Sequence, residues 1–172
     1  MRDAFWPVVL IGGLAALYWY RWEVGHMALD ATVGTATDEV DTLARTMWGE
    51  ARGEGRVGME AVANVVVNRV AFSKARGGYW WGNSVTEVCL KPWQFSAWNP
   101  GDPNAVKLRR VNSTDQAFSL ALEIARLAVA GKLPDRTGGA THYHTRAVSP
   151  GWKAGAIKTA SIGAHEFYRG VA

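Results

Sequence analysis

Apolar residues recur at three- and four-residue steps between positions 38 and 52, and this period predicts an amphipathic helix over Asp38–Arg52. Thr37 or Asp38 can cap its start, where acidic side chains favour the helix dipole. Glu50 lies seven residues after the first leucine of the apolar stripe, so it continues the buried side of the helix. The stripe consists of Val40, Leu43, Ala44, Met47 and Trp48.

The same period predicts further helices along the chain. One runs over residues 57–72, and another opens at the capping box Ser113–Gln116 and ends at Gly131. A short helix is expected over Ser84–Leu90, with Ser84 as its cap.

Alternating patterns appear near the C-terminus and predict strands. Thr141–Thr145 alternates, so His142 and His144 share one face of a strand. Ser161–Tyr168 also alternates, and it places Ile162, Ala164, Glu166 and Tyr168 on one face and His165 and Phe167 on the other. A small two-stranded hairpin added to the helices makes a mainly helical α+β fold.

An irregular stretch over Lys91–Asn104 lies between the predicted helices. Its three prolines interrupt regular structure, and its aromatic residues alternate with amides and hydroxyls. Aromatic faces stack on the apolar faces of sugar rings while polar groups bind sugar hydroxyls, so the stretch is interpreted as a binding loop. The alternative is a lid anchored by its aromatic residues. The candidate binding residues are Gln94, Phe95, Ser96 and Trp98.

The N-terminal run Ala4–Tyr20 carries no charge and matches the short end of the about 17 to 25 residues that span a membrane. Aromatic residues at its end favour an uncleaved anchor, because a signal peptide would need small residues at its cleavage site. A buried core helix is a third interpretation. The expected organisation is an anchor over residues 1–22, a linker over 23–37 and a catalytic domain over 38–172.

Composition narrows the class of protein without deciding it. A chain of 172 residues with 48% hydrophobic content holds one domain and an appendage. The net charge of +4 suits an anionic partner, but basicity and aromatic residues alone are a thin basis for nucleic-acid binding. The single cysteine, Cys89, excludes an intramolecular disulfide.

Candidate chemistry gathers where the first predicted helix meets a glycine-rich corner, Trp48–Gly55. Glu50 and Glu54 lie four residues apart, and they either serve catalysis or are solvated charges paired with Arg52. The apolar stripe favours catalysis for Glu50, because a carboxyl group partly withdrawn from water favours its acid form. A general acid needs that form. Glu54 is the candidate second carboxylate.

Other chemistries have weaker signals. His142, His144 and His165 are compatible with zinc, but no His-Glu-x-x-His helix is present and cleft-lining histidines are more common. No Gly-x-Ser-x-Gly elbow and no phosphate-binding loop occur. Asn68 on the second helix either lines a polar cleft or is solvated.

Five motifs in order resemble the SleB-like cell-wall hydrolases, which include spore-cortex-lytic enzymes and bacteriophage lysis proteins. They cover roughly residues 38–169. The motifs are Trp-Gly-Glu-Ala-Arg-Gly-Glu at 48–54, Ala-Val-Ala-Asn-Val-Val-Val-Asn-Arg-Val at 61–70, Gln-Phe-Ser-x-Trp at 94–98, Gly-Ala-Thr-His-Tyr-His at 139–144 with Pro-Gly-Trp at 150–152, and Ile-Gly-x-His-x-Phe-Tyr at 162–168.

The resemblance implies a lysozyme-like helical fold, peptidoglycan glycan strands as substrate and no cofactor or metal. It implies lytic transglycosylation with Glu50 as the catalytic acid. The further substrate-binding candidates are Tyr143 and Trp152, beside Asn68, the loop residues and the three histidines. The chain departs from the spore enzymes in having a short apolar N-terminus where they have a peptidoglycan-binding domain. That terminus resembles the termini of signal-anchor lysis proteins. The expected location is therefore the inner membrane, with the catalytic domain in the periplasm, and the protein is expected to be able to leave the membrane.

Two alternatives from other classes remain at this stage. A zinc-dependent cell-wall peptidase would use the three histidines and lose activity in a chelator. A membrane-anchored carbohydrate-binding protein would lack activity altogether, and Glu50→Gln would leave it unchanged. An ordinary two-carboxylate hydrolase, with Glu54 as the second acid, also stays open.

Overall fold

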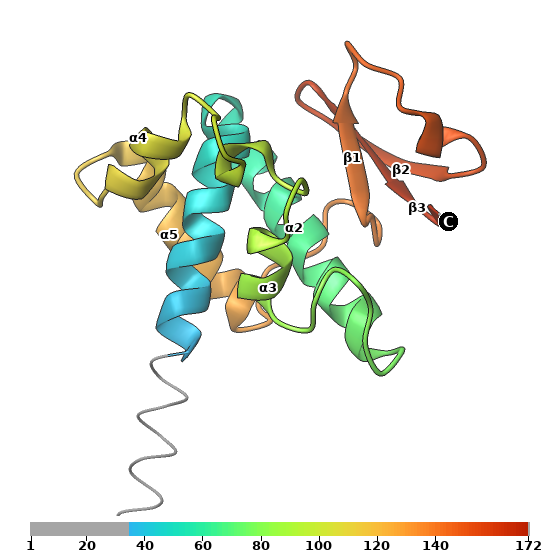
Figure 1. Ribbon diagram of the computed structural model, residues 1–172, viewed down its shortest axis with the longest axis horizontal. Coiled ribbons are helices and arrows are strands. Elements are labelled where there is room, and N and C mark those ends of the chain that lie inside the picture. The colour runs from blue at the N-terminus through green and yellow to red at the C-terminus, as the bar shows by residue number, and fades with distance from the viewer. Residues whose placement is uncertain (1–34, 172) are drawn as a thin grey trace, which may run out of the picture. The chain divides into compact units, whose positions relative to one another are not determined.

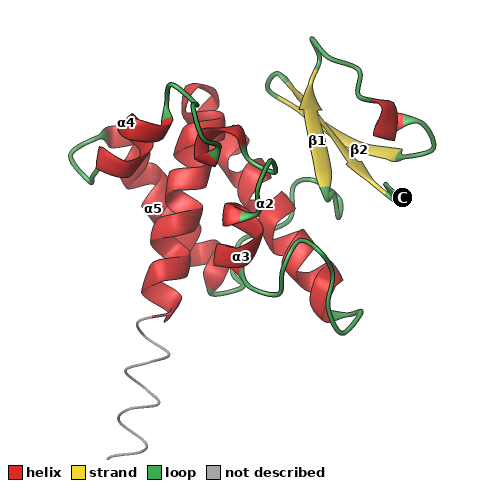
Figure 2. Cartoon of the chain, in the orientation of Figure 1, coloured by secondary structure: helices red, strands yellow, loops and turns green. Residues whose placement is uncertain are grey.

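The computed structural model describes residues 35–171, and within them a group of helices lies beside a small antiparallel sheet (Figures 1 and 2). The chain is helical over residues 35–51, here called the lead helix, and turns through η1 (Arg52–Glu54) into α2 (Gly55–Lys74). The short helices α3 (Val85–Leu90), η2 (Ser96–Trp98) and α4 (Ala105–Arg110) follow, and α5 (Gln116–Val129) completes the helical group.

The lead helix, α2 and α5 supply most of the main core. The predicted stripe of the lead helix is buried from Leu43 onward. The buried residues of α5 are Phe118, Ala121, Ile124, Ala125 and Ala128. Several residues that connect α2 to α5 join them in the same cluster, including Trp81, Val88, Phe95 and Leu108. Burial of this apolar surface provides most of the driving force for folding.

The helix predictions hold for the long elements and fail at some ends. Both α2 and α5 form where the apolar period placed them, and Ser84 caps α3 by accepting the N–H of Glu87 at 3.2 Å. The predicted capping box of α5 was wrong, because Asp115 is the cap and accepts the N–H of Phe118 at 2.8 Å. The lead helix is already helical at residue 35, so neither Thr37 nor Asp38 marks its start.

The sheet has three strands in the order β1-β3-β2: β1 (His142–Thr145), β2 (Ile157–Ile162) and β3 (His165–Arg169). The predicted hairpin of two strands was therefore incomplete. The predicted strand Ser161–Tyr168 in fact contains the end of β2, a tight turn and most of β3. The chain reverses at Gly163, whose φ is +56°. Ile162 and Phe167 thus pack in the same cluster, although strict alternation would separate them.

One face of the sheet packs on α2. Phe167 joins Ala61 and Val65 of α2 and Ala140 in a second apolar cluster, and Tyr143 packs against both clusters. Residues opposite one another in the ladder share a face, so Tyr143 and Phe167 point inward while His144 and Glu166 point outward. This packing fixes β1 beside the helices.

The described residues include no helix long and apolar enough to cross a membrane. The predicted anchor over residues 1–22 and most of the predicted linker lie outside the described residues, and residues 35–37 of that linker are helical.

Candidate active site

Glu50 lies half-buried in the last turn of the lead helix, and both of its carboxylate oxygens accept hydrogen bonds. The Oε1 atom accepts the Ser96 hydroxyl at 3.2 Å and the Ala97 N–H at 3.4 Å. The Oε2 atom accepts the Tyr143 hydroxyl at 2.9 Å. Donors from η2 and β1 thus hold one side chain that the lead helix presents.

Gly49 lets η2 come close enough to make these contacts. A Cβ atom at position 49 would lie 2.5 Å from the Cβ atom of Ala97, a separation that real Cβ contacts do not show. Only glycine therefore permits the Ala97 N–H to approach the neighbouring Glu50 carboxylate.

Tyr143 points inward from β1, between Phe167 and His165. Burial and the neighbouring Glu50 carboxylate raise the pKa of Tyr143 well above its ordinary value of 10. The phenol therefore stays protonated and remains a donor to Glu50 across the neutral range.

Arg69 of α2 is the buried cation of this region. Its Nε donates to the carbonyl oxygen of Thr141 at 2.7 Å, and its guanidinium lies over the rings of Trp81 and Phe95. Burial lowers the pKa of Arg69 to about 10, so it stays charged at neutral pH. Arg69 thus ties the strand that carries Tyr143 to the aromatic wall of the helical core.

Glu54 and Arg52 have other roles than pairing at the corner. Glu54 Oε1 lies 2.9 Å from Nδ1 of His165, and its Oε2 accepts the N–H of Ala164 at 3.3 Å, so it anchors the β2–β3 turn. Arg52 donates to the carbonyls of Trp48 and Gly49, and in this way it caps the end of the lead helix. It also donates to the side-chain oxygen of Asn104. The alternative in which Arg52 pairs with the two acids is therefore not what these contacts show.

Glu50 opens into a cleft of about 320 Å³ between the helices and the sheet. Six predicted site residues line it: Glu50, Gln94, Ser96, Tyr143, His144 and His165. Glu50 is the only carboxylate in the lining, as far as residues 35–171 are concerned. The cleft therefore offers one acid, held by three donors.

Other predicted site residues have structural positions. Phe95 is 1% exposed in the core, and the Trp98 indole N–H donates to Thr46 at 2.9 Å. Asn68 donates to the carbonyl of Ala140 at 3.1 Å and steadies the loop before β1. Gln94 and Ser96 of the predicted binding loop thus line the cleft, so their role in binding stays a prediction. Phe95 and Trp98 are anchored in the fold, as the lid alternative expected.

His142 and Trp152 belong to the outer face of the sheet, where Trp152 packs on His142, His144 and Tyr168. His165 is on the opposite face, since it pairs with Thr145 rather than with His144. His144 and His165 thus reach the cleft from opposite faces of the sheet, and His142 does not line it. Across residues 35–171 no group of three or more His, Cys, Asp or Glu side chains has the arrangement of a metal site.

The cleft also contains Trp93 and Asn99, which belong to the predicted binding loop but were not among its candidate residues. The sequence reasoning missed three further lining residues, namely Arg69, Thr145 and Val148. Arg69 had a usable signal, because it lies three residues after Val66 on the apolar stripe of α2. Trp93 had the signal of an aromatic residue in the predicted loop, but its left-handed backbone conformation, with φ of 66°, could not be predicted.

With this geometry in place, comparison with known proteins defines the class. The sequence profile of the Cell Wall Hydrolase family matches residues 53–168, well over half of the chain. The chain therefore belongs to that family of enzymes, and the resemblance noted in the sequence is confirmed. The match begins three residues after Glu50.

Particular relatives agree with this class. The chain is 29% identical over 143 residues to the spore cortex-lytic enzyme of Halalkalibacterium halodurans, covering 81% of this chain and 37% of that protein. It thus spans well under two thirds of this relative's length.

Two solved structures share the fold. The catalytic domain of the germination-specific lytic transglycosylase SleB from Bacillus anthracis is 26% identical, with a TM-score of 0.57 over 76% of this chain and 93% of that one. The catalytic domain of the Bacillus cereus SleB protein is 25% identical, with a TM-score of 0.59 over 77% and 91%. The mainly helical fold with a small antiparallel sheet is therefore that of SleB catalytic domains.

Proposed function

We propose that this protein cleaves the glycosidic bond between N-acetylmuramic acid and N-acetylglucosamine in peptidoglycan, as a lytic transglycosylase. The observation that carries the proposal is the single carboxylate of the cleft, Glu50, held by Ser96, Ala97 and Tyr143. A relative of similar fold is named a lytic transglycosylase, which agrees with this chemistry.

In the proposed reaction Glu50 acts first as an acid and then as a base. Protonated Glu50 gives its proton to the bridging oxygen, the bond from that oxygen to muramyl C1 breaks, and an oxocarbenium-like state forms. The muramyl C6 hydroxyl then bonds to C1 while its proton returns to Glu50. The products are a free N-acetylglucosamine hydroxyl and a 1,6-anhydro ring, and no water is consumed.

The three donors around Glu50 suit both halves of this cycle. When Glu50 loses its proton, hydrogen bonds from Ser96, Ala97 and Tyr143 stabilise the carboxylate that forms. The same contacts restrict the side chain to one orientation, so that it can return to the C6 hydroxyl as a base.

The contacts of Glu54 support a mechanism with one carboxylate. An ordinary hydrolase uses two acids, about 5 Å apart for retention or about 6.5–9.5 Å apart for inversion. Both oxygens of Glu54 are engaged by His165 and Ala164 in the β2–β3 turn, and Glu54 does not line the cleft. The substrate's own hydroxyl therefore takes the place of a second catalytic group.

Glu50→Gln tests the proposal. The amide keeps the size of the side chain but cannot deliver the proton, so release of soluble fragments from purified peptidoglycan should fall about 100- to 10,000-fold. Thermal unfolding of the variant should stay close to that of the unchanged protein. Near-normal activity in a folded variant would refute the role of Glu50. If both the unchanged protein and the variant bind glycan strands without cleaving them, the carbohydrate-binding alternative is correct.

We also propose that Ala4–Tyr20 holds the protein at the inner membrane with the catalytic domain in the periplasm, where it acts in bacterial or phage-induced wall lysis. The uncharged run and its aromatic end support this setting. Its glycines and alanines make the attachment weak enough for release, so Gly12→Leu with Gly13→Leu should retain the protein in membrane fractions and delay lysis. Recovery of the unchanged protein from the cytosol would count against the anchor.

A further inference from the structure

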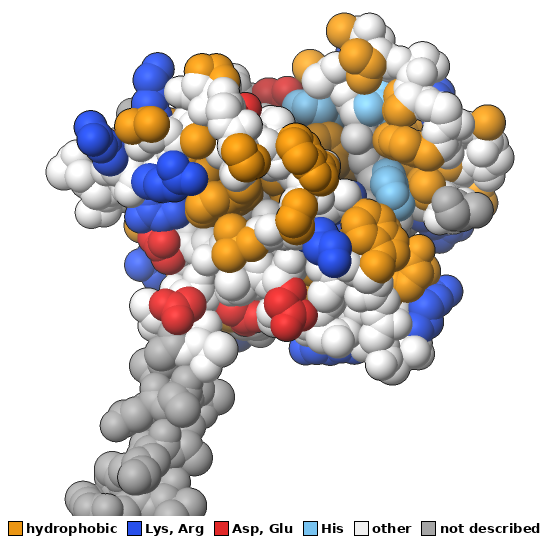
Figure 3. Space-filling model, viewed as in Figure 1, with side chains coloured by type: hydrophobic (Ala, Val, Ile, Leu, Met, Phe, Trp, Pro, Cys, Tyr) orange, Lys and Arg blue, Asp and Glu red, His pale blue; other side chains and the backbone are white. Residues whose placement is uncertain are grey.

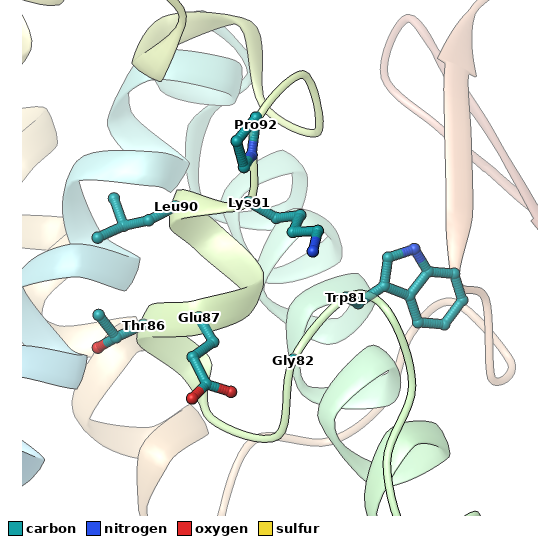
Figure 4. A pocket seen from close by; sticks show the side chains of 7 residues that line it. All are labelled: Trp81, Gly82, Thr86, Glu87, Leu90, Lys91 and Pro92. Carbon is teal, nitrogen blue, oxygen red and sulfur yellow. The ribbon is translucent and has the colours of Figure 1, made fainter.

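A second hollow of about 400 Å³ lies between α3 and the loop that follows α2. It is lined by Trp81, Gly82, Thr86, Glu87, Leu90, Lys91 and Pro92. Figure 4 shows the Lys91 side chain extending toward the side on which the Trp81 indole lies, with Pro92 above. The lining is mostly apolar, with one ammonium group at hand.

Exposed aromatic surface adjoins this hollow. Trp80 is 49% exposed, its ring centroid lies 5.7 Å from that of Trp81, and the Lys91 ammonium lies 5.7 Å from the Trp80 centroid. Leu90 is likewise half exposed at 46%. Figure 3 shows hydrophobic side chains gathered on this side of the molecule, over α3 and the loops that flank it. An aromatic ring next to an apolar hollow and a cation is a surface suited to an amphipathic ligand.

Two polar groups of the hollow differ in how they are satisfied. The Glu87 carboxylate accepts the N–H of Asn83 at 2.6 Å and completes the cap of α3. The Trp81 indole N–H is buried without a hydrogen-bond acceptor among the described residues. The Glu87 carboxylate is therefore engaged within the fold, and the Trp81 ring, which is 2% exposed, is a buried part of the lining.

The hollow and the Glu50 cleft are lined by consecutive residues of one loop. Lys91 and Pro92 line the hollow, and the next two residues of the chain, Trp93 and Gln94, line the cleft. Trp93 is 74% exposed and has a positive φ of 66°, held by a hydrogen bond from its N–H to Asn99 at 3.1 Å. A bulky residue in that conformation is uncommon, and such strain persists mainly at functional sites.

We propose that the hollow and the exposed ring of Trp80, here called the Trp80 site, bind the same glycan strand beyond the bond cleaved at Glu50. Sugar rings in a strand offer apolar faces for Trp80 and Leu90. Their hydroxyl and acetamido oxygens offer acceptors for the Lys91 ammonium. The inference rests on the proposed function, because it assigns the continuation of that substrate to the hollow whose lining residues directly precede Trp93 and Gln94 of the cleft.

Binding measured in a catalytically inactive background tests the proposal. Glu50→Gln protein is titrated with peptide-free glycan strands of two lengths, long strands that reach both surfaces and short ones that fill only the cleft. Adding Trp80→Ala should weaken binding of long strands about tenfold, the order expected when one aromatic anchor leaves an interface. Short strands should bind both proteins equally. Lys91→Gln should also weaken binding of long strands, by a smaller factor than Trp80→Ala.

Val106→Ala is the matched control, because Val106 is an exposed apolar residue of α4, 55% exposed, and lines neither surface. It should leave both affinities unchanged. Equal binding of long strands with and without Trp80, or an equal loss for both lengths, would overturn the proposal. Binding that requires stem peptides would also overturn it, in favour of a peptide site.

These outcomes are separable from the proposed function. Failure of the unchanged protein to cleave any strand would overturn the proposed chemistry, while the binding measurement would still report on the Trp80 site. Cleavage that depends on Glu50 together with length-independent binding would retain the chemistry and refute the Trp80 site.

Discussion

Three hydrogen-bond donors from distant parts of the chain converge on the two carboxylate oxygens of Glu50. Ser96 and Ala97 follow it by more than 40 residues, and Tyr143 follows by more than 90. Because two donors come from η2 and the third from β1, the carboxylate is held by the fold rather than by its own helix. The reactive residue and its supports are thus separate parts of the sequence.

The Tyr143→Phe substitution isolates one of these supports. It removes only the hydroxyl that donates to Glu50 Oε2 at 2.9 Å, and hydrogen bonds to charged groups contribute about 1.5–3 kcal/mol. We expect kcat to fall about 10- to 100-fold, with KM and thermal unfolding nearly unchanged. Unaltered kcat in steady-state cleavage of purified strands would show that the phenol has no part in the reaction.

At this scale the sequence predicted the half-buried position of Glu50, and it predicted the positions of the neighbouring residues unevenly. Glu50 could be found because helical period extends the buried stripe to it. Phe95 and Trp98 were assigned to the substrate, although both are anchored in the fold. An aromatic residue in a loop has the same pattern whether it faces ligand or core, so only tertiary contacts separate the two.

At the scale of elements, the corner η1 and the β2–β3 turn are joined through Glu54. Its carboxylate contacts His165 and the N–H of Ala164, and a Cβ atom at position 163 would lie 1.8 Å from its Oε2. Glycine at 163 is thus required both by its φ of +56° and by the approach of Glu54. This contact sets His165 beside Tyr143 at the edge of the cleft.

Glu54→Gln distinguishes an anchor from a second catalytic acid. The amide can still accept one of the two hydrogen bonds, so we expect less than about a tenfold loss of turnover and a lower melting temperature. Glu50→Gln should instead lose about 100-fold or more with its melting temperature retained. A Glu54→Gln protein that melts normally but is as inactive as Glu50→Gln would support a two-carboxylate mechanism.

The sequence predicted long elements better than short ones. Repeated apolar positions identified α2 and α5, because one face of a long helix must be buried. The six-residue helix α4 went unpredicted, since it has too few residues to show a period. The sheet was predicted with two strands in place of three, because an alternating pattern continues through a tight turn that only the conformation of Gly163 reveals.

At the scale of the whole described domain, the outer face of the sheet links stability to pH. Burial, followed by the charge of Arg69, lowers the pKa of His142 from its ordinary 6.5 to about 4. Hydrogen bonds from Lys158 and Tyr168 lower the pKa of Glu166 from 4.5 to about 2. Both shifts mean that the unfolded chain binds more protons than the folded one in acid.

The free energy of unfolding should therefore fall as pH decreases from about 6.5 to 4 through His142, and from about 4.5 to 2 through Glu166. His142→Asn removes the first titration. The melting temperature of this variant should therefore change less between pH 6.5 and 4.5 than that of the unchanged protein. The decline below pH 4.5 should remain in both proteins. Melting temperatures are measured by circular dichroism at each pH. If they change with pH to the same extent in both proteins, the contribution of His142 is refuted.

The central claim is that one carboxylate and the substrate's own C6 hydroxyl carry out the cleavage. Mass spectrometry of the fragments released from purified peptidoglycan tests it most directly. A mechanism with one carboxylate predicts muramyl ends in the 1,6-anhydro form, lighter by one water molecule than reducing ends, from the first turnovers onward. Reducing muramyl ends with incorporated solvent oxygen would contradict it and would show that water, activated by a second group, is the nucleophile.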